Sequence, residues 1–193
     1  MGQPDLWIVQ GIDHVKALLD HGGKTSATGQ LLQISIEAHI VELGKKGSLL
    51  DHDEVTYDRM EDTWIKNTLQ FATQTNIQLD GPIPTLQHWK KNDALIMDIV
   101  DTHKDASFTE QHIQAANRCR IYLKATPVSD IVDNTGTIMP AAWLLATSME
   151  TTSASAYQWP AQKRPDTTDM LHWQRALRRF ANLRPHNPNA DFT

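Results

Sequence analysis

Cationic and aromatic side chains recur together near the end of the 193-residue chain. Lysine and arginine neutralise phosphate groups, and an exposed tryptophan ring offers a surface on which a nucleic-acid base can stack. The residues of this kind are Lys163, Arg164, Arg175, Arg178 and Arg179, together with Trp159 and Trp173. Their combination makes this region the best candidate in the sequence for contact with RNA or DNA.

The same arginines fit a second, purely structural role. Arg175, Arg178 and Arg179 fall in the later part of a helix expected over residues 166–184. Cations near the C-terminus of a helix stabilise it through the helix macrodipole, typically by about 0.3–1 kcal/mol each. The helix would then present a solvated basic face that binds nothing, and the sequence leaves both roles open.

A second basic pair lies in the stretch "NRCRIYLKATPVSDIVDNTGTI", residues 117–138. On a helix, Arg118 and Arg120 lie about 100° to either side of Cys119, which belongs to the apolar stripe. Each guanidinium is therefore expected at the border between core and solvent, paired with a carboxylate such as Asp130 or Asp133. The alternative is that these two arginines contact nucleic-acid phosphates.

Residues that could carry catalysis or bind a metal ion form no recognised pattern. Three groups of possible metal ligands lack the spacing of zinc sites. They are the acidic stretch at residues 51–54, the pair Asp98 and Asp101, and the pair His14 and His21. The single cysteine has no histidine placed beside it by the local sequence, and esterase, P-loop and dinucleotide-binding motifs are absent. We therefore expect no catalytic residue, no metal ion and no cofactor.

Composition separates the two ends of the chain. The net charge is −5, but residues 1–155 hold 12 Lys and Arg against 20 Asp and Glu, whereas residues 156–193 hold 6 against 3. Broad phosphate binding needs clustered cations, so only the later region could support it. No apolar run is long enough to span a membrane, so we expect no membrane partner. A lone cysteine cannot form an internal disulfide, so we expect an intracellular protein, cytoplasmic or nuclear.

Hydrophobic periodicity predicts a mainly α fold, a compact bundle of five or six helices with a small β-hairpin near residues 129–139. Ser26 or Thr25, Thr109 and Asp166 are expected to cap helices, and Gly44 to end one. The predicted helices span residues 5–20, 26–43, 62–76, 92–103, 110–125 and 166–184. The predicted core residues are Leu32, Ile36, Ile40, Trp64, Leu69, Ile99, Cys119 and Leu123.

The chain is expected to divide into four parts. Residues 1–146 form a helical domain that includes the hairpin, and residues 147–165, rich in Ser, Thr, Ala and Pro, form an extended connector. Residues 166–184 form a basic helix that packs on or beside the domain, and residues 185–193 form a frayed tail.

Several stretches, taken in order, resemble a region of eukaryotic retroelement open reading frame proteins. They include "DTWIKNTLQFA", "NRCRIYL" followed by "SDI" and a "GT" turn, and an end in which "QWP" precedes "HWQRALRR". In those proteins the region follows the reverse transcriptase palm and precedes a ribonuclease H-like segment. The resemblance spans most of residues 5–180.

The resemblance implies a thumb-like or connecting module within an RNA-directed DNA polymerase. Polymerase chemistry requires a carboxylate pair that holds two Mg²⁺ ions, and this chain has no Tyr-x-Asp-Asp type pair. The implied role is therefore non-catalytic, with RNA, DNA or neighbouring reverse transcriptase modules as partners. The alternative is a protein-interaction or structural domain whose tryptophans in the region 143–173 dock on a partner.

Overall fold

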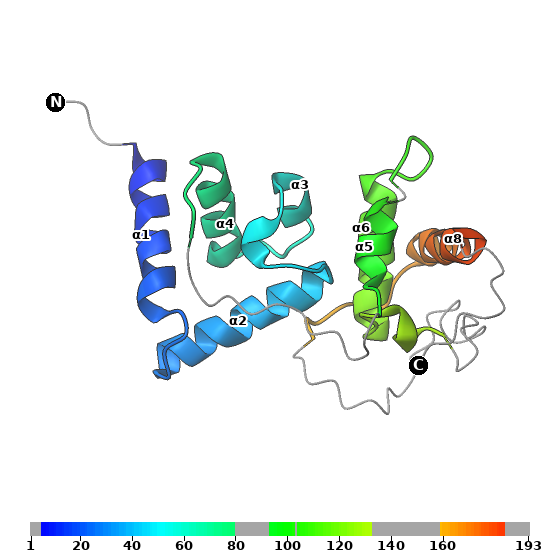
Figure 1. The fold of residues 1–193 in the computed structure, drawn as a ribbon, viewed down its shortest axis with the longest axis horizontal. Helices are drawn as coiled ribbons and strands as arrows, with labels where there is room; N and C mark the ends of the chain where they lie inside the picture. Colours follow the sequence, from blue (N-terminus) through cyan, green and yellow to red (C-terminus); the bar gives the residue numbers. More distant parts are fainter. Residues whose placement is uncertain (1–4, 80–92, 103, 133–158, 184–193) are drawn as a thin grey trace. The chain divides into compact units, whose positions relative to one another are not determined.

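The computed structural model describes residues 5–79, 93–102, 104–132 and 159–183, and its regular structure is helical (Figure 1). Between described residues, β pairing is limited to two isolated bridges, Leu95 with Pro127 and Asp105 with Phe108. The predicted mainly helical class is therefore confirmed. No helix within these ranges combines the length and the apolar character that crossing a membrane requires.

Contacts within the chain gather into two compact units, Met1–Leu86 and Gln87–Thr193. This division falls inside the helical domain expected over residues 1–146, and the last helix belongs to the second unit. Periodicity predicts where a helix buries a face. It does not identify which helices share a core, because an apolar stripe can pack against many partners.

The first unit begins and ends its helices at residues with strong local preferences. The Ser26 hydroxyl accepts a hydrogen bond from the backbone N–H of Gly29 at 3.2 Å, and Gly44 ends the same helix with φ 61°. Both boundaries agree with the prediction, whereas the helix expected after Asp62 begins after Thr63. The elements are Leu6–His21 (α1), Ala27–Leu43 (α2), Leu49–Asp51 (η1), Glu54–Tyr57 (α3) and Trp64–Gln74 (α4).

A glycine allows α1 and α4 to lie side by side (Figure 1). A Cβ atom added to Gly11 would stand 2.3 Å from the ring of Phe71, a distance that no side chain could tolerate. Trp7 places its ring against the same phenylalanine, with centroids 4.8 Å apart and planes at 65°. Gly11 therefore lets the Phe71 ring pack directly on the backbone of α1.

Most of the predicted core is buried, namely Leu32, Ile36, Ile40, Leu69, Cys119 and Leu123. Ile99 is partly buried and packs against the core of the second unit. The prediction for Trp64 is wrong, because this side chain is 40% exposed. It is the first residue of α4. Its ring packs in a T-shaped arrangement with the His14 ring, with centroids 5.8 Å apart, instead of entering the interior.

The second unit also follows its predicted caps. The Asp166 carboxylate accepts a hydrogen bond from the backbone N–H of Asp169 at 2.8 Å, and another helix begins after Thr109. That helix ends at Leu123, two residues before its predicted end, and Lys124 is the C-cap in the left-handed conformation (φ 55°). The elements are Ile96–Thr102 (α5), Glu110–Leu123 (α6), Val128–Asp130 (η2) and Thr167–Leu183 (α8).

The core of the second unit forms where α8 packs along α6. Trp173 has 0% of its surface exposed and is the largest side chain in this core. Buried apolar neighbours come from α5, α6, α8 and the chain around η2, and they include Ile96, Met97, Val100, Phe108, Ile113, Ala116, Cys119, Val128, Ile131, Ala176 and Leu177. The last helix is therefore part of this unit's core.

Parts of three predictions lie outside the described residues. The chain at residues 128–130 is the 3₁₀ turn η2, but residues 133–139 are not described, so the hairpin near 129–139 stays a prediction. The same holds for residues 147–158 of the expected connector and for the expected tail at 185–193. Residues 159–166 are described and contain no helix or strand.

Replacing Trp173 with Ala should lower the free energy of unfolding by about 3–5 kcal/mol, because the substitution leaves a cavity in the core. Leu171 stands on the opposite side of α8 and is 59% exposed. Leu171→Ala is therefore a matched control, with a change expected within about 0.5 kcal/mol. Chemical denaturation followed by circular dichroism measures both variants, and equal losses would contradict this placement of Trp173.

Candidate nucleic-acid interface

The structure separates the nine predicted contact residues into two groups. One group faces the interior or a partner within the second unit, and it comprises Arg118, Arg120, Arg179, Trp159 and Trp173. The other group is exposed, and it comprises Lys163, Arg164, Arg175 and Arg178. The side chains of the first group are engaged within the fold, whereas those of the second group face solvent.

Arg118 joins α6 to α8 through a two-point ion pair with Asp169. Its Nη2 lies 2.6 Å from Oδ1, and its Nε lies 3.0 Å from Oδ2. This geometry is among the strongest that arginine forms, and the hydrogen-bonded carboxylate raises the pKa of Arg118. The sequence does not predict this partner of Arg118, because the packing of α8 brings in a carboxylate 51 residues away. Asp133, one of the two carboxylates expected from the sequence, lies outside the described residues.

Arg120 is buried, with 0% of its surface exposed. Its Nε donates to Asn117 Oδ1 at 2.8 Å, and its Nη1 donates to the carbonyl of Ala125 at 3.1 Å. The guanidinium carbon lies 5.8 Å from the centroid of the Trp159 ring, within cation–π range. Arg120 therefore anchors the chain after α6 and cannot reach a phosphate, which corrects its prediction as a contact residue.

The two tryptophans predicted to stack on bases are also buried or partly buried. Trp173 exposes no surface, so it cannot stack on a base. Trp159 is half-buried, and its ring is contacted by the Arg120 guanidinium. Both tryptophans contribute to the fold of the second unit.

Arg179 holds the turn before α6 against α8. Its Nη1 lies 2.9 Å from Asp105 Oδ2, and its Nη2 lies 2.6 Å from the Ser107 hydroxyl. The guanidinium carbon also lies 5.0 Å from the centroid of the Phe108 ring. The arginine and the serine hold the pKa of Asp105 well below its usual range, so this ion pair persists into acid.

The remaining cations make no ion pair with any described residue. Arg175 and Arg178 stand three residues apart on the exposed side of α8, and Lys163 and Arg164 lie two to three residues before Asp166, which caps that helix. We call these four residues the basic surface. The helix periodicity sets this division, since the opposite side of α8 carries the buried residues.

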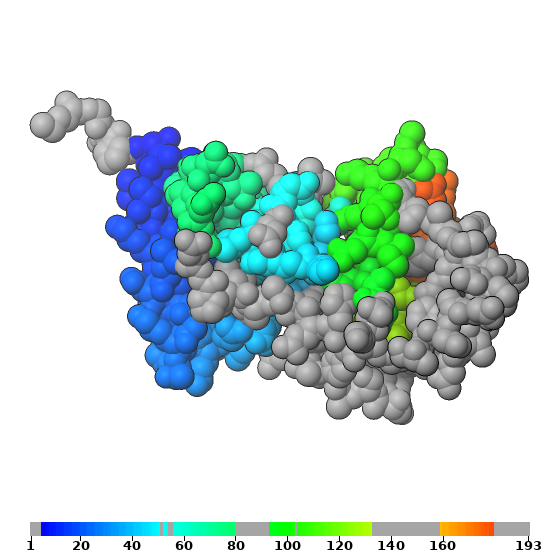
Figure 2. Space-filling model, viewed as in Figure 1, coloured from blue at the N-terminus to red at the C-terminus, as the bar shows by residue number. Residues whose placement is uncertain are grey.

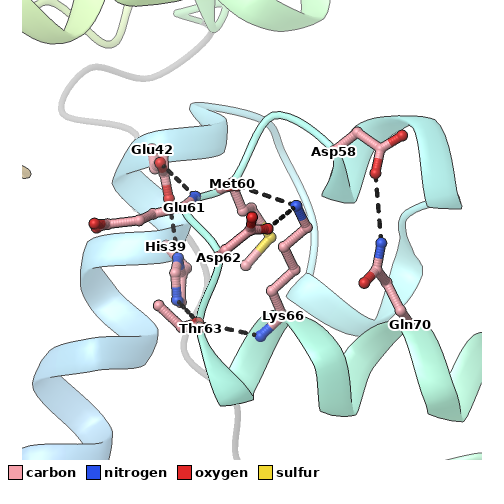
Figure 3. Close-up of polar contacts among 9 residues, drawn as sticks. All are labelled: His39, Glu42, Asp58, Met60, Glu61, Asp62, Thr63, Lys66 and Gln70. Atoms are coloured by element: carbon pink, nitrogen blue, oxygen red, sulfur yellow. Dashed lines mark hydrogen bonds and ion pairs between the residues drawn. The ribbon is translucent and has the colours of Figure 1, made fainter.

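The first unit holds a polar cluster that the sequence does not predict (Figure 3). His39 is 5% exposed, and its Nδ1 and Nε2 lie 2.9 Å from Glu42 Oε2 and 2.8 Å from Thr63 Oγ1. A carboxylate, an imidazole and a hydroxyl in this order have the connectivity of a catalytic triad. The hydroxyl, however, caps α4 by accepting the Lys66 N–H at 3.3 Å, and the other Glu42 oxygen accepts the Glu61 N–H at 2.8 Å.

The position of these groups favours a structural role for the cluster. Both ring nitrogens of His39 are hydrogen-bonded, one to Glu42 and the other to Thr63. Because Thr63 caps α4, these three groups connect α2 to the start of α4. Nearby, the buried Lys66 reaches the carboxylate of Asp62 at 2.7 Å. The spacing of His39 and Glu42 was the only local sign of this cluster, since Thr63 is 24 residues away.

Cys119, the one candidate nucleophile in the sequence, is buried. Burial, aided by the negative charge of Asp169, raises the pKa of its thiol to about 12. A thiol in this state carries almost no thiolate at neutral pH and is unreactive. Within the described part of the chain, no three His, Cys, Asp or Glu side chains converge to hold a metal ion.

Comparison with protein-family models, with curated proteins and with solved structures finds no significant match to this chain. The retroelement resemblance therefore rests on the quoted motifs alone.

Cys119 should react with an aromatic disulfide reagent only after unfolding. With a thiol pKa of about 12, the native protein holds roughly one thiolate in ten thousand at pH 8, against a substantial fraction for an ordinary cysteine. Absorbance of the released thiol, followed with and without denaturant, measures the difference. Rapid labelling of the folded protein would show that Cys119 is accessible.

Proposed function

We propose that this chain is a non-catalytic helical module that contacts the phosphates of RNA or DNA through the basic surface. The observation that carries the proposal is the set of four exposed cations that lack an ion-pair partner among the described residues, within a chain of net charge −5. The motif resemblance supports it, because a thumb-like or connecting module lies beside a nucleic-acid substrate. Neighbouring reverse transcriptase modules are the second partner it suggests, in the cytoplasm or the nucleus.

Such a surface contacts phosphates and does not read bases. Lysine and arginine on an exposed helix face neutralise backbone charge and release counterions, which is a sequence-independent contribution. Trp173 is buried and Trp159 is partly covered, so neither ring offers an open stacking platform. We therefore expect weak binding with little sequence preference.

Binding to a labelled single strand should weaken with salt, with a slope of log K against log salt near about −3. The slope follows from four phosphate contacts and about 0.7 counterions released per contact. Fluorescence anisotropy at several salt concentrations measures it, and the double variant Arg175→Ala with Arg178→Ala should roughly halve it.

Lys16→Ala is the matched control, because Lys16 is an exposed cation on α1 of the first unit. This variant should bind like the parent chain. Absence of binding at low salt, or binding that salt does not change, would remove the proposal.

A second candidate function is protein docking through α1 and the start of α2, the blue part of the surface in Figure 2. This surface carries exposed apolar side chains, namely Leu6, Trp7, Ile8, Val9, Ile12 and Leu19 on α1 and Leu31 and Ile34 on α2. A large exposed apolar patch usually marks a protein contact. Here the docking residues would be on the first unit, whereas the alternative stated from the sequence uses tryptophans between residues 143 and 173.

Self-association through this surface should appear as a mass that rises with concentration in sedimentation equilibrium. Changing Ile8, Ile12 and Leu19 to Ser should abolish the rise and leave the folded state intact, because all three side chains are exposed. The contrasting variant is Leu32→Ser, which places a hydroxyl in the core and should destabilise the fold. A monomer mass at every concentration of the parent chain would exclude docking between copies.

A further inference from the structure

His112 closes the first turn of α6. The backbone N–H of Thr109 donates a hydrogen bond to its Nδ1 at 2.9 Å, and the Thr109 hydroxyl lies 2.9 Å from the same nitrogen. This arrangement is a capping box, in which the third helical residue is more often Glu or Gln. A backbone N–H can only donate, so Nδ1 must carry no proton and the imidazole is neutral here.

Two rings enclose this imidazole. Phe108 stacks on it with centroids 5.5 Å apart and planes at 19°, and His172 of α8 meets it edge-on with centroids 4.3 Å apart. The cap of α6 is therefore part of the contact between α6 and α8. A change in the charge of His112 acts on both the helix start and the helix contact.

The charged groups that face His112 are mainly positive. From α8 they are His172, Arg175 and Arg179, and from the turn before α6 the nearest carboxylate is Asp105, which is bound to Arg179. Burial, followed by these neighbouring positive charges, holds the pKa of His112 below its ordinary value.

One further ion pair flanks the turn. Lys104 and Glu110 lie 3.1 Å apart and largely neutralise each other. No described carboxylate is hydrogen-bonded to the His112 ring to favour its protonated form, so the surroundings favour the neutral imidazole.

We propose that His112 makes the contact between α6 and α8 sensitive to pH, with proton binding at Nδ1 releasing the cap of α6 and loosening the turn at residues 105–108 from α8. A protonated Nδ1 becomes a donor, so the Thr109 N–H loses its acceptor. The imidazolium is also repelled by Arg175 and Arg179. This inference goes beyond the nucleic-acid proposal and does not depend on it.

The direction of the effect follows from proton linkage. An unfolded histidine titrates near pH 6.5, whereas folded His112 takes its proton only at a lower pH. Stability from this group is complete above about pH 6.5 and is lost as the pH falls through the folded pKa. Within that window, each unit by which the pH falls raises the unfolding equilibrium constant by up to about tenfold.

The variant His112→Gln tests the proposal, because glutamine keeps the capping-box acceptor but cannot take a proton. At about pH 7.5 the two proteins should be similarly stable. As the pH falls toward about 5, the unfolding equilibrium constant of the parent chain should rise relative to that of His112→Gln, by up to about tenfold per pH unit. His14→Gln removes an imidazole from the first unit, away from the contact between α6 and α8, and is the matched control. Identical profiles for the parent and His112→Gln would overturn the proposal.

A measurement on the parent protein keeps the proposal testable if the variant folds poorly. Proton NMR of the His112 ring should give a titration midpoint below about 6.5, and the amide of Thr109 should shift with the same midpoint. The protection factors for hydrogen exchange in the first turn of α6 should fall as the pH falls over that range. A midpoint at or above the ordinary value, or a Thr109 amide that does not respond, would also overturn it.

Discussion

The packing of α8 on α6 depends on one side of α8 that carries both Trp173 and Asp169. The tryptophan fills the core, and the carboxylate meets Arg118 at two points, so apolar burial and a directional ion pair act on the same helix. Burying the ring supplies most of the free energy, because partly exposed ion pairs contribute little. The ion pair instead fixes the rotation and register of α8.

This register decides which cations serve the fold and which face outward. Once Asp169 meets α6, Arg179 falls beside the turn at residues 105–108, where it binds Asp105 and Ser107. Arg175 and Arg178 are left toward the exposed side of the helix. The helix geometry therefore divides cations that look equivalent in the sequence into structural and exposed charges.

The sequence predicts features that depend on neighbouring residues. Ser26, Gly44 and Asp166 mark helix ends because their hydrogen bonds or φ angles involve groups only a few residues away. The partner of Arg118 could not be predicted, since Asp169 is 51 residues distant and meets it only through the packing of two helices. The candidate surface shared this limit: its cations were identifiable, but their exposure depended on which side of α8 is buried.

Among the residues that the structure describes, the core of the second unit extends from Ile96 to Leu177. The first unit has a separate set of contacts, including the close approach of Gly11 to Phe71. We therefore expect damage to one set of helices to act first on the apolar interior of its own unit. Sequence change can accumulate in one half of the chain while the other half keeps its shape, and selection can act on the two halves at different rates.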